Sequence, residues 1–155
     1  ALEAKDFAKV FGVNVTGNYQ MVRAVWPHLK QAPGASIVNV STSGSLTGLG
    51  SSIAYAASKG ALNVMTLSMA RSLAPHVRVN TICPGVVDTG WRLQFMSPEE
   101  YDAFKVKELK LAPLAHIASA DEIAEAIHWL STAAPSVTGQ IITIDNGVNL
   151  RLGQV

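Results

Sequence analysis

The sequence predicts an α/β fold in which a parallel β-sheet carries helices on both of its faces. Three short apolar runs have the composition of buried strands: SIVNVS at 36–41, VRVNTIC at 77–83 and QIITID at 140–145. Segments with apolar residues at helical spacing lie before, between and after these runs. Strands that alternate with helices are typical of parallel sheets, because a parallel connection must be long enough to hold a helix.

The first predicted helix covers residues 3 to about 31. Gly12, Asn14 and Gly17 are poor helix formers inside this segment, so we expect a kink or short break near Asn14. Pro27 lies inside the same pattern and should bend or end the helix.

The run at 36–41 is apolar and β-branched, which is typical of a strand buried on both faces. As the first of three strands it is either an edge strand or the partner of a strand outside the chain, and it carries no charge that would protect an edge. Residues 42–52 are rich in Gly, Ser and Thr and should form a loop.

The second predicted helix covers residues 54–74 and ends at Pro75. Its first half is dense in small residues, which permit close packing against a neighbouring element. If the segment is helical, Tyr55 and Lys59 share one face with Cβ atoms roughly 5–6 Å apart. Taken alone, such a pair is more often structural than catalytic.

The strand at 77–83 ends at Pro84-Gly85 and is followed by a long connection over 86–118. This connection is too long to lack structure in a compact domain. Ser97-Pro98-Glu99-Glu100 is a capping box that predicts a helix over about 98–109. A second capping box begins at Ser119 and predicts another helix before the last strand.

The composition indicates one globular domain over residues 1–155, with a net charge of +1 and a pI of about 8.1. These values point to neither nucleic acid nor membranes as partners, and the single cysteine, Cys83, fits a reducing compartment. We see no signal peptide or membrane segment and expect a cytoplasmic protein. Charged residues are 15% of the chain, which is low and suggests that other subunits or a further part of the fold cover some surface.

The hydroxyl-rich segment Asn39 to Gly44 follows the first strand directly. In open α/β sheets ligands bind beyond the carboxyl ends of the strands, so these hydroxyls and the Tyr55–Lys59 pair should meet at one rim. A phenol, an ammonium and hydroxyls together suit proton transfer to a carbonyl or from an alcohol. The alternative interpretation is an ordinary Gly/Ser/Thr turn followed by a helix start.

Taken together, several segments resemble the C-terminal part of the short-chain dehydrogenase/reductase family, in the family's order and spacing. They are VNVTG at 13–17, SIVNVSTSGS at 36–45, YAASKGAL at 55–62, RVNTICPGVVDT at 78–89, DEIAEAIHWL at 121–130 and TGQIITIDNG at 138–147. The pair of Tyr55 and Lys59 is weak evidence by itself, whereas the ordered set is highly specific.

The resemblance implies a catalytic role for several residues and NAD or NADP as the cofactor. Tyr55 would be the general acid/base, and Lys59 would favour its ionised form and hold the nicotinamide ribose. Asn14 would support a water relay from Lys59 to solvent. The residues implied to line the cofactor, besides Tyr55 and Lys59, are Pro84, Gly85, Val87 and Thr89.

The family's substrate-orienting serine corresponds to Thr42, thirteen residues before Tyr55. Threonine keeps the hydroxyl, but its extra methyl group crowds the site and restricts the rotamer. Ser41 and Ser43 are alternatives that should point away from Thr42, because side chains alternate along a strand.

Smaller departures from the family pattern are Asn146, where a second glycine is usual, and His116, where an arginine often stands. The large departure is that the family begins with a βαβ unit and a glycine-rich pyrophosphate loop, which we do not find before Asn14. We therefore expect a partial Rossmann-like, doubly wound sheet that lacks the N-terminal dinucleotide-binding half. The segment 44–50 does not have the spacing of that loop, and we interpret it as a substrate-side loop.

Other residues carry weaker signals. The four histidines have no metal-ligand spacing, so no metal site is expected. Apolar residues in the region of the family's substrate lid either line a substrate or pack the loop down; they are Trp91, Leu93, Phe95 and Met96.

Two functions remain open at this point. The first is an NAD(P)-dependent oxidoreductase that interconverts a small-molecule alcohol and a carbonyl. The second is a catalytically inactive fragment that acts as an oligomerisation or interaction module. The family commonly associates through its two long middle helices and through its last helix and strand, and we expect a homo-oligomer. A further possibility is that the chain is a truncated portion of an ordinary dehydrogenase.

Overall fold

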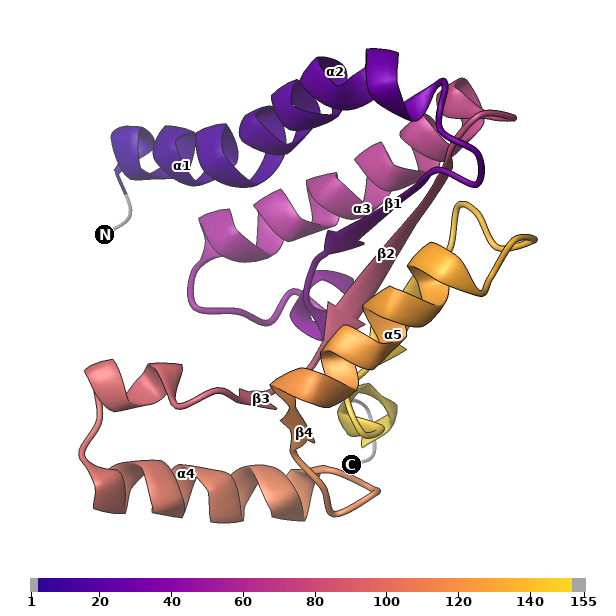
Figure 1. The fold of residues 1–155 in the computed structure, drawn as a ribbon. Helices are drawn as coiled ribbons and strands as arrows, with labels where there is room; N and C mark the ends of the chain where they lie inside the picture. The colour runs from indigo at the N-terminus through magenta and orange to yellow at the C-terminus, as the bar shows by residue number, and fades with distance from the viewer. Residues whose placement is uncertain (1–2, 152–155) are drawn as a thin grey trace.

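The structure is a computed structural model that describes residues 3–151, and its elements alternate in the predicted order (Figure 1). The α-helices are α1 (Ala4–Phe11), α2 (Asn18–Leu29), α3 (Ile53–Leu73), α4 (Pro98–Leu111) and α5 (Ala120–Thr132). The strands are β1 (Ser36–Val40), β2 (Arg78–Pro84), β3 (Val87–Asp88), β4 (Ala118–Ser119) and β5 (Ile141–Ile144). Short 3₁₀ helices are η2 (Ser43–Leu46), η3 (Trp91–Gln94) and η4 (Val148–Arg151), and η1 (Gly12–Gly17) is π-helical.

The three predicted strands form one parallel sheet with the order β1-β2-β5. Ser36 of β1 lies opposite Arg78 of β2, and Thr81 of β2 lies opposite Ile141 of β5. The strands therefore run in the same direction, and their carboxyl ends share one rim. The predicted fold class is confirmed.

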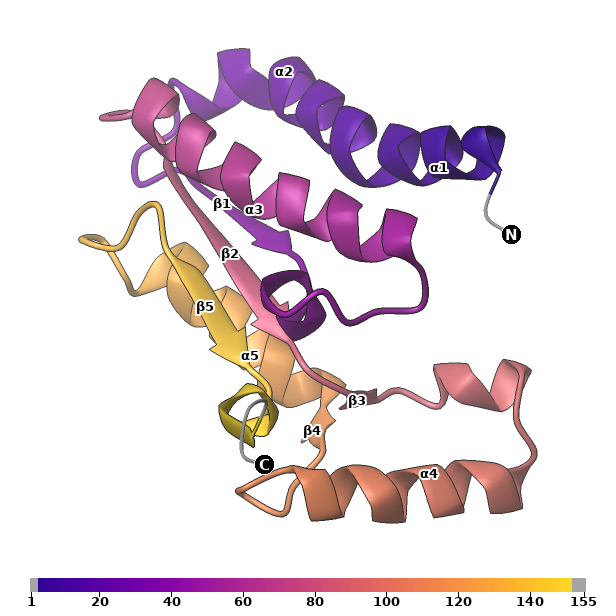
Figure 2. The same ribbon diagram turned by 180° about the vertical axis from the view of Figure 1, so that it is seen from behind.

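Helices cover both faces of this sheet, with α2 and α3 on one face and α5 on the other, while α1 extends from α2 alongside α3 (Figures 1 and 2). Alternating side chains of β2 serve the two layers: Val79 packs with Met69 of α3, whereas Ile82 packs with Ile123 and Leu130 of α5. Because both faces are covered, every residue of β2 after Arg78 is buried, including the polar Asn80 and Thr81.

The strand β1 is less buried than its sequence predicts. Asn39 is buried, but the other residues of the strand are partly exposed, and Val40 is 44% exposed. The reason is that β1 is an edge strand of the sheet that residues 3–151 form. Both faces of β1 are nevertheless covered, because Ile37 packs against the apolar cluster on the α3 side and Val38 against the cluster on the α5 side. Of the two alternatives given for this strand, the edge strand applies to the described residues.

The predicted break in the first helix is present as the π-helical segment η1, which contains Asn14. π-helical turns accommodate one extra residue and often occur at functional sites. Pro27 does not end the helix at once, because α2 continues to Leu29.

The expectation of loop over 42–52 is wrong for Ser43–Leu46, which form η2. The 86–118 connection contains the predicted helix as α4, and it also contains a two-residue parallel pair, β3 with β4. Strands of two residues show no periodicity, so sequence reasoning had no signal for this pair.

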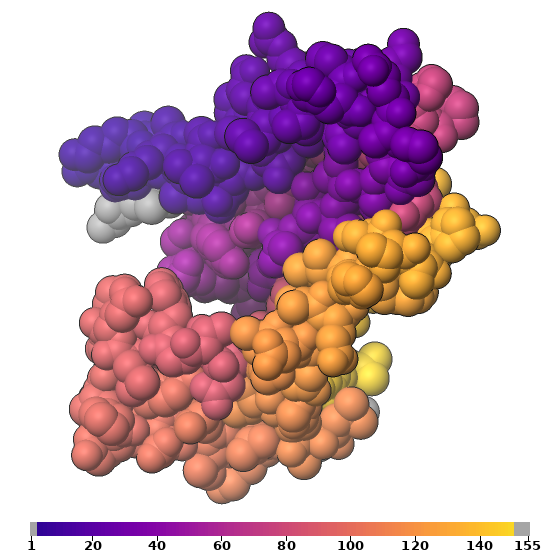
Figure 3. Space-filling view, in the orientation of Figure 1, coloured from indigo at the N-terminus to yellow at the C-terminus, as the bar shows by residue number. Residues whose placement is uncertain are grey.

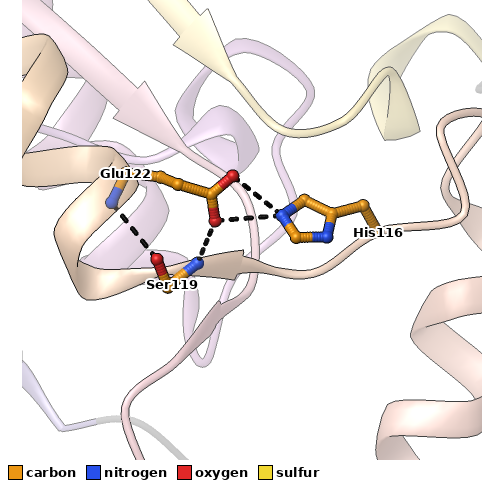
Figure 4. Close-up of polar contacts among 3 residues, drawn as sticks. All are labelled: His116, Ser119 and Glu122. Carbon is orange, nitrogen blue, oxygen red and sulfur yellow. Dashed lines mark hydrogen bonds and ion pairs between the residues drawn. The ribbon is translucent and has the colours of Figure 1, made fainter.

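The helix α5 begins with the predicted capping box (Figure 4). The Ser119 hydroxyl accepts the Glu122 amide at 3.2 Å, and the Glu122 carboxylate accepts the Ser119 amide at 2.7 Å. The same carboxylate pairs with His116 Nε2 at 2.9 Å. His116, noted as a departure from the family pattern, thus joins the base of the connection to α5.

The segment from η3 to α4, here called the arm, projects from the sheet as a separate lobe (Figure 3). Its contacts to β3 are polar: the Tyr101 hydroxyl donates to Asp88 Oδ1 at 2.5 Å. Within the arm, the Arg92 guanidinium lies 4.2 Å from the centre of the Phe104 ring. Across residues 3–151, no helix combines the length and apolar character needed to cross a membrane.

Candidate active site

The start of α3 brings Tyr55 and Lys59 together at the rim of the sheet. The Ser52 hydroxyl caps this helix by accepting the Tyr55 amide at 3.1 Å, which sets where the first turn begins. Tyr55 and Lys59 are both half-buried, and the Lys59 ammonium lies 5.9 Å from the centre of the Tyr55 ring. The i,i+4 spacing thus produces the shared face that the sequence predicted.

The Lys59 ammonium is held by the backbone of β1, because it donates to the Val40 carbonyl at 2.9 Å. Burial lowers the pKa of Lys59, and the neighbouring Cys83 partly offsets this effect. The contact links α3 to the carboxyl end of β1, two residues before Thr42.

Thr42 follows β1 directly and lies half-buried at the same rim, with its Oγ1 3.5 Å from the Pro84 carbonyl. Ser41 and Ser43 are buried instead. The Ser41 hydroxyl donates to the Lys59 carbonyl at 3.1 Å, so it packs the strand end against α3. Among these three hydroxyl residues, Thr42 has the most accessible position.

Asn14 reaches across from η1 to α3. Its Nδ2 donates to Ser58 Oγ at 3.0 Å, and the Ser58 hydroxyl donates to the Tyr55 carbonyl at 2.8 Å. The side chain therefore braces the π-helical segment against the turn that carries Tyr55 and Lys59. Its role in a water relay stays a prediction.

The residues predicted to line a cofactor continue from the end of β2. A Cβ atom on Gly85 would lie 2.9 Å from both Cα and Cβ of Asp145, so close packing at the end of β5 already requires glycine here. Val87 belongs to β3, and the Thr89 hydroxyl accepts the Trp91 amide at 3.3 Å. Pro84 joins this stretch to Thr42, and the binding role of all four residues stays a prediction.

The glycines of the 44–50 segment have local packing reasons. A side chain on Gly44 would overlap the Leu49 carbonyl, so the loop closes on itself at that point. A Cβ atom on Gly50 would lie 3.1 Å from Cδ1 of Tyr55. Gly50 therefore lets the loop pack against the Tyr55 ring, a contact that sequence reasoning missed because glycine spacing does not reveal which ring lies nearby.

Buried polar residues also join the elements beneath the rim. Asn39 of β1 donates to Thr66 Oγ1 of α3 at 2.7 Å, and the Thr66 and Thr81 hydroxyls are 2.6 Å apart. Asn18 of α2 donates to Asn39 Oδ1 at 3.1 Å. Sequence reasoning did not single out Asn18, Thr66 or Thr81, since a polar residue in a helix or strand pattern carries no information about its partner.

The structure also bears on two weaker signals, the possible metal ligands and the apolar residues of the long connection. The part of the chain that the structure describes contains no group of three or more His, Cys, Asp or Glu side chains arranged to hold a metal. In the arm, Trp91, Leu93 and Phe95 are exposed, so they do not pack the connection down onto the sheet. Met96 is half-buried.

Residues 1–149 match the family model described as enoyl-(acyl carrier protein) reductase. The chain belongs to the short-chain dehydrogenase/reductase family. YusR of Bacillus subtilis, a short-chain dehydrogenase/reductase homolog, is 40% identical over 134 residues, which cover 86% of this chain and 98% of that protein. The inactive 2-(S)-hydroxypropyl-CoM dehydrogenase 2 of Xanthobacter autotrophicus is 32% identical, with 94% of this chain and 65% of that protein covered.

Solved structures support the same assignment. The crystal structure of a 3-oxoacyl-[acyl-carrier protein] reductase with bound NAD from Brucella melitensis is similar, with a TM-score of 0.77 and 30% identity. The match covers 95% of this chain and 53% of that one. The chain spans little more than half the length of most curated relatives that it matches. The fold is therefore part of a Rossmann-type sheet, as the sequence predicted.

Proposed function

We propose that this chain carries the acid/base part of an NAD(P)-dependent oxidoreductase that interconverts an alcohol and a carbonyl, with Tyr55 as the general acid/base. Family membership supports oxidoreductase chemistry in general. The observation that carries the specific proposal is the position of Lys59, held by the Val40 carbonyl with its ammonium 5.9 Å from the Tyr55 ring.

In this proposal Tyr55 donates its phenolic proton to the carbonyl oxygen during reduction and accepts the alcohol proton during oxidation. The Lys59 charge favours the phenolate, because an adjacent positive charge stabilises the ionised form of an acid. Thr42, at the same rim, provides a hydroxyl that orients the substrate oxygen.

The residues present fit the nicotinamide end of the cofactor. A lysine ammonium has three donors, and the structure of residues 3–151 gives Val40 as the acceptor of one, so two are available for ribose hydroxyls. Pro84, Gly85, Val87 and Thr89 follow from the strand end beside Thr42 and would hold the nicotinamide side. When bound, the cofactor supplies or accepts the hydride.

The test is to titrate the purified protein with NADH and with NADPH, and then to assay alcohols in the presence of the nucleotide that binds. We expect Tyr55→Phe to keep nucleotide binding and to lose at least about 100-fold in kcat, as removal of a general acid/base does. Tyr19→Phe, on the exposed side of α2, is the matched control and should behave as the unaltered protein. Full activity of Tyr55→Phe would contradict the proposal, as would the failure of both nucleotides to bind.

A second candidate function is an interaction module without catalysis. Apolar residues are widely exposed on the helical layer formed by α1, η1, α2 and α3, and Val13, Met21, Ile53 and Val64 are each at least 65% exposed. A groove of about 370 Å³ lies between α2 and α3, lined by residues that include Trp26 and Met65. If this layer is an interface, light scattering should find a stable dimer or larger assembly; a monodisperse monomer would count against it.

A further inference from the structure

We infer that Ser45 and Asn63 are positioning residues that fix the orientation of Thr42 at the rim. This inference rests on the proposed function for its effect on turnover, but its structural part stands independently. The geometry points to a chain of hydrogen bonds that runs from β2 through α3 and η2 to the residue after β1.

This series of hydrogen bonds ends at the backbone of Thr42. The Thr42 carbonyl accepts the Ser45 hydroxyl at 2.6 Å and the Ser45 amide at 3.1 Å. Two hydrogen bonds to one carbonyl fix the peptide that follows Thr42, and this restricts the direction in which the Thr42 side chain leaves the strand end.

Asn63 determines the direction of the Ser45 hydroxyl. Asn63 Nδ2 donates to Ser45 Oγ at 2.8 Å. A hydroxyl has one proton to donate, and here Asn63 supplies the proton of this contact, so the Ser45 proton is free to point at the Thr42 carbonyl. Loss of the amide would allow the Ser45 hydroxyl to rotate away.

The orientation of the Asn63 amide is itself fixed. Asn63 is 4% exposed, and its Oδ1 lies 3.8 Å from the Cys83 sulfur, whose thiol donates to it. Cys83 is fully buried in β2, and burial raises the pKa of this thiol, so the donor proton is retained. Asn63 stands eight residues after Tyr55, two turns along the same rigid helix.

The chain of bonds therefore relates Thr42 to the helix that carries Tyr55. Both Ser45 and Asn63 lie apart from the predicted acid/base pair, and neither touches Tyr55 or Lys59 by any hydrogen bond that the structure gives among residues 3–151. Their role is to set the distance and angle between the hydroxyl of Thr42 and the phenol of Tyr55.

The structural test is carried out on the full chain without nucleotide, labelled with ¹³C at the threonine methyl groups. We expect Ser45→Ala and Asn63→Leu each to move the Thr42 methyl resonance, while that of Thr143, exposed on β5, stays in place. Ser68→Ala removes a hydroxyl from the exposed side of α3 and should leave the Thr42 resonance unchanged. An unmoved Thr42 resonance in both variants, or an equal movement in Ser68→Ala, would overturn the inference.

Circular dichroism checks that each variant folds. If Ser45→Ala or Asn63→Leu does not fold, Cys83→Ala is a milder substitution that tests the same series of hydrogen bonds. This variant removes the thiol donor, and it too should move the Thr42 resonance; no movement in the folded Cys83→Ala variant would overturn the chain of bonds.

The functional test compares kcat and KM for the same variants. We expect Ser45→Ala to reduce kcat by about tenfold, since small displacements of an orienting group cost one to two orders of magnitude, with the nucleotide KM unchanged. An unchanged kcat would overturn the positioning role. If the unaltered protein oxidises no alcohol, the proposed function fails, whereas the methyl resonance still decides whether Ser45 and Asn63 hold Thr42.

Discussion

Two regions of the molecule differ in the contacts that hold them in place: the sheet together with α3, and the arm. In the sheet and α3, Leu62 and Ile82 are 2% and 0% exposed, so the tight packing of apolar residues holds the elements in place. In the arm, Phe95 is 71% exposed, and α4 is joined to β3 by polar contacts, as between Tyr101 and Asp88. The difference leads us to expect that packing fixes the geometry at Tyr55, whereas the exposed side chains of the arm contribute less to overall stability.

The largest expected contrast comes from truncating one apolar side chain to alanine in each region. Leu62→Ala should lower the free energy of unfolding by about 3 kcal/mol, because it opens a cavity in a fully packed site. Phe95→Ala should change it by less than about 0.5 kcal/mol, because the ring is largely in solvent already. Urea unfolding followed by circular dichroism measures both values; similar losses would show that the arm is an integral part of the core.

A smaller effect is expected where α5 is anchored to the sheet. The Arg78 guanidinium donates to the carbonyls of Leu130, Ser131 and Ala134 at 2.7, 2.9 and 2.9 Å, and so satisfies the carboxyl end of α5. Arg78→Met should cost about 2 kcal/mol in the same urea experiment, as hydrogen bonds to a charged donor are lost. Arg71→Met, exposed on α3, is the control and should be nearly neutral. If Arg78→Met leaves the free energy of unfolding unchanged, water satisfies these carbonyls as well as the guanidinium does.

Loss of the hydrogen bond between Tyr101 and Asp88 should destabilise the arm without destabilising the sheet. Tyr101→Phe removes the donor to Asp88 and should destabilise the arm by about 1 kcal/mol. Hydrogen exchange should accelerate in α4 and stay unchanged in α3, because few apolar contacts couple the two regions. Uniform acceleration across both helices would show that the arm and the sheet unfold as one unit.

The smallest effect is expected at the start of α5, where the contacts of Glu122 with Ser119 and His116 predict that stability depends on pH. The Ser119 amide, and then the His116 side chain, lower the pKa of Glu122 to about 2 from its usual 4.5. Because the folded state binds this proton less readily, the contribution to stability is present in full above pH 4.5 and is lost as the pH falls towards 2.

Glu122→Gln should therefore reduce the loss of thermal stability that acid causes in this range. Glu125→Gln, on the exposed side of the same helix, should keep the acid sensitivity of the unaltered protein. Equal acid sensitivity in the Glu122→Gln variant would contradict the assignment. The size of the effect is small, since both partners of the His116 contact are about half exposed.

Local patterns determined much of the architecture. Apolar β-branched runs identified β1, β2 and β5, and the capping boxes at Ser97 and Ser119 identified the starts of α4 and α5. Poor helix formers around Asn14 marked the place of η1. These signals are readable because each depends on residues a few positions apart.

Other features depend on residues that are distant in the sequence, and sequence reasoning missed them. The close approach of Gly50 to Tyr55 and the chain from Cys83 through Asn63 to Ser45 are contacts between separate elements. The exposure of β1 differs from these, because an edge strand was one of two alternatives left open; whether a strand is an edge depends on its neighbours and not on its own composition.

The sequence by itself determined the family, the order of helices and strands, and the identity of the Tyr55–Lys59 pair, because ordered motifs and helical spacing are properties of the chain. The tertiary structure alone decided what surrounds that pair. It shows which carbonyl accepts the Lys59 ammonium, which hydroxyl follows β1 at the accessible rim, and which side chain donates to the Thr42 carbonyl. Such contacts arise only when packing brings distant parts of the chain together, and a linear pattern does not encode their distances.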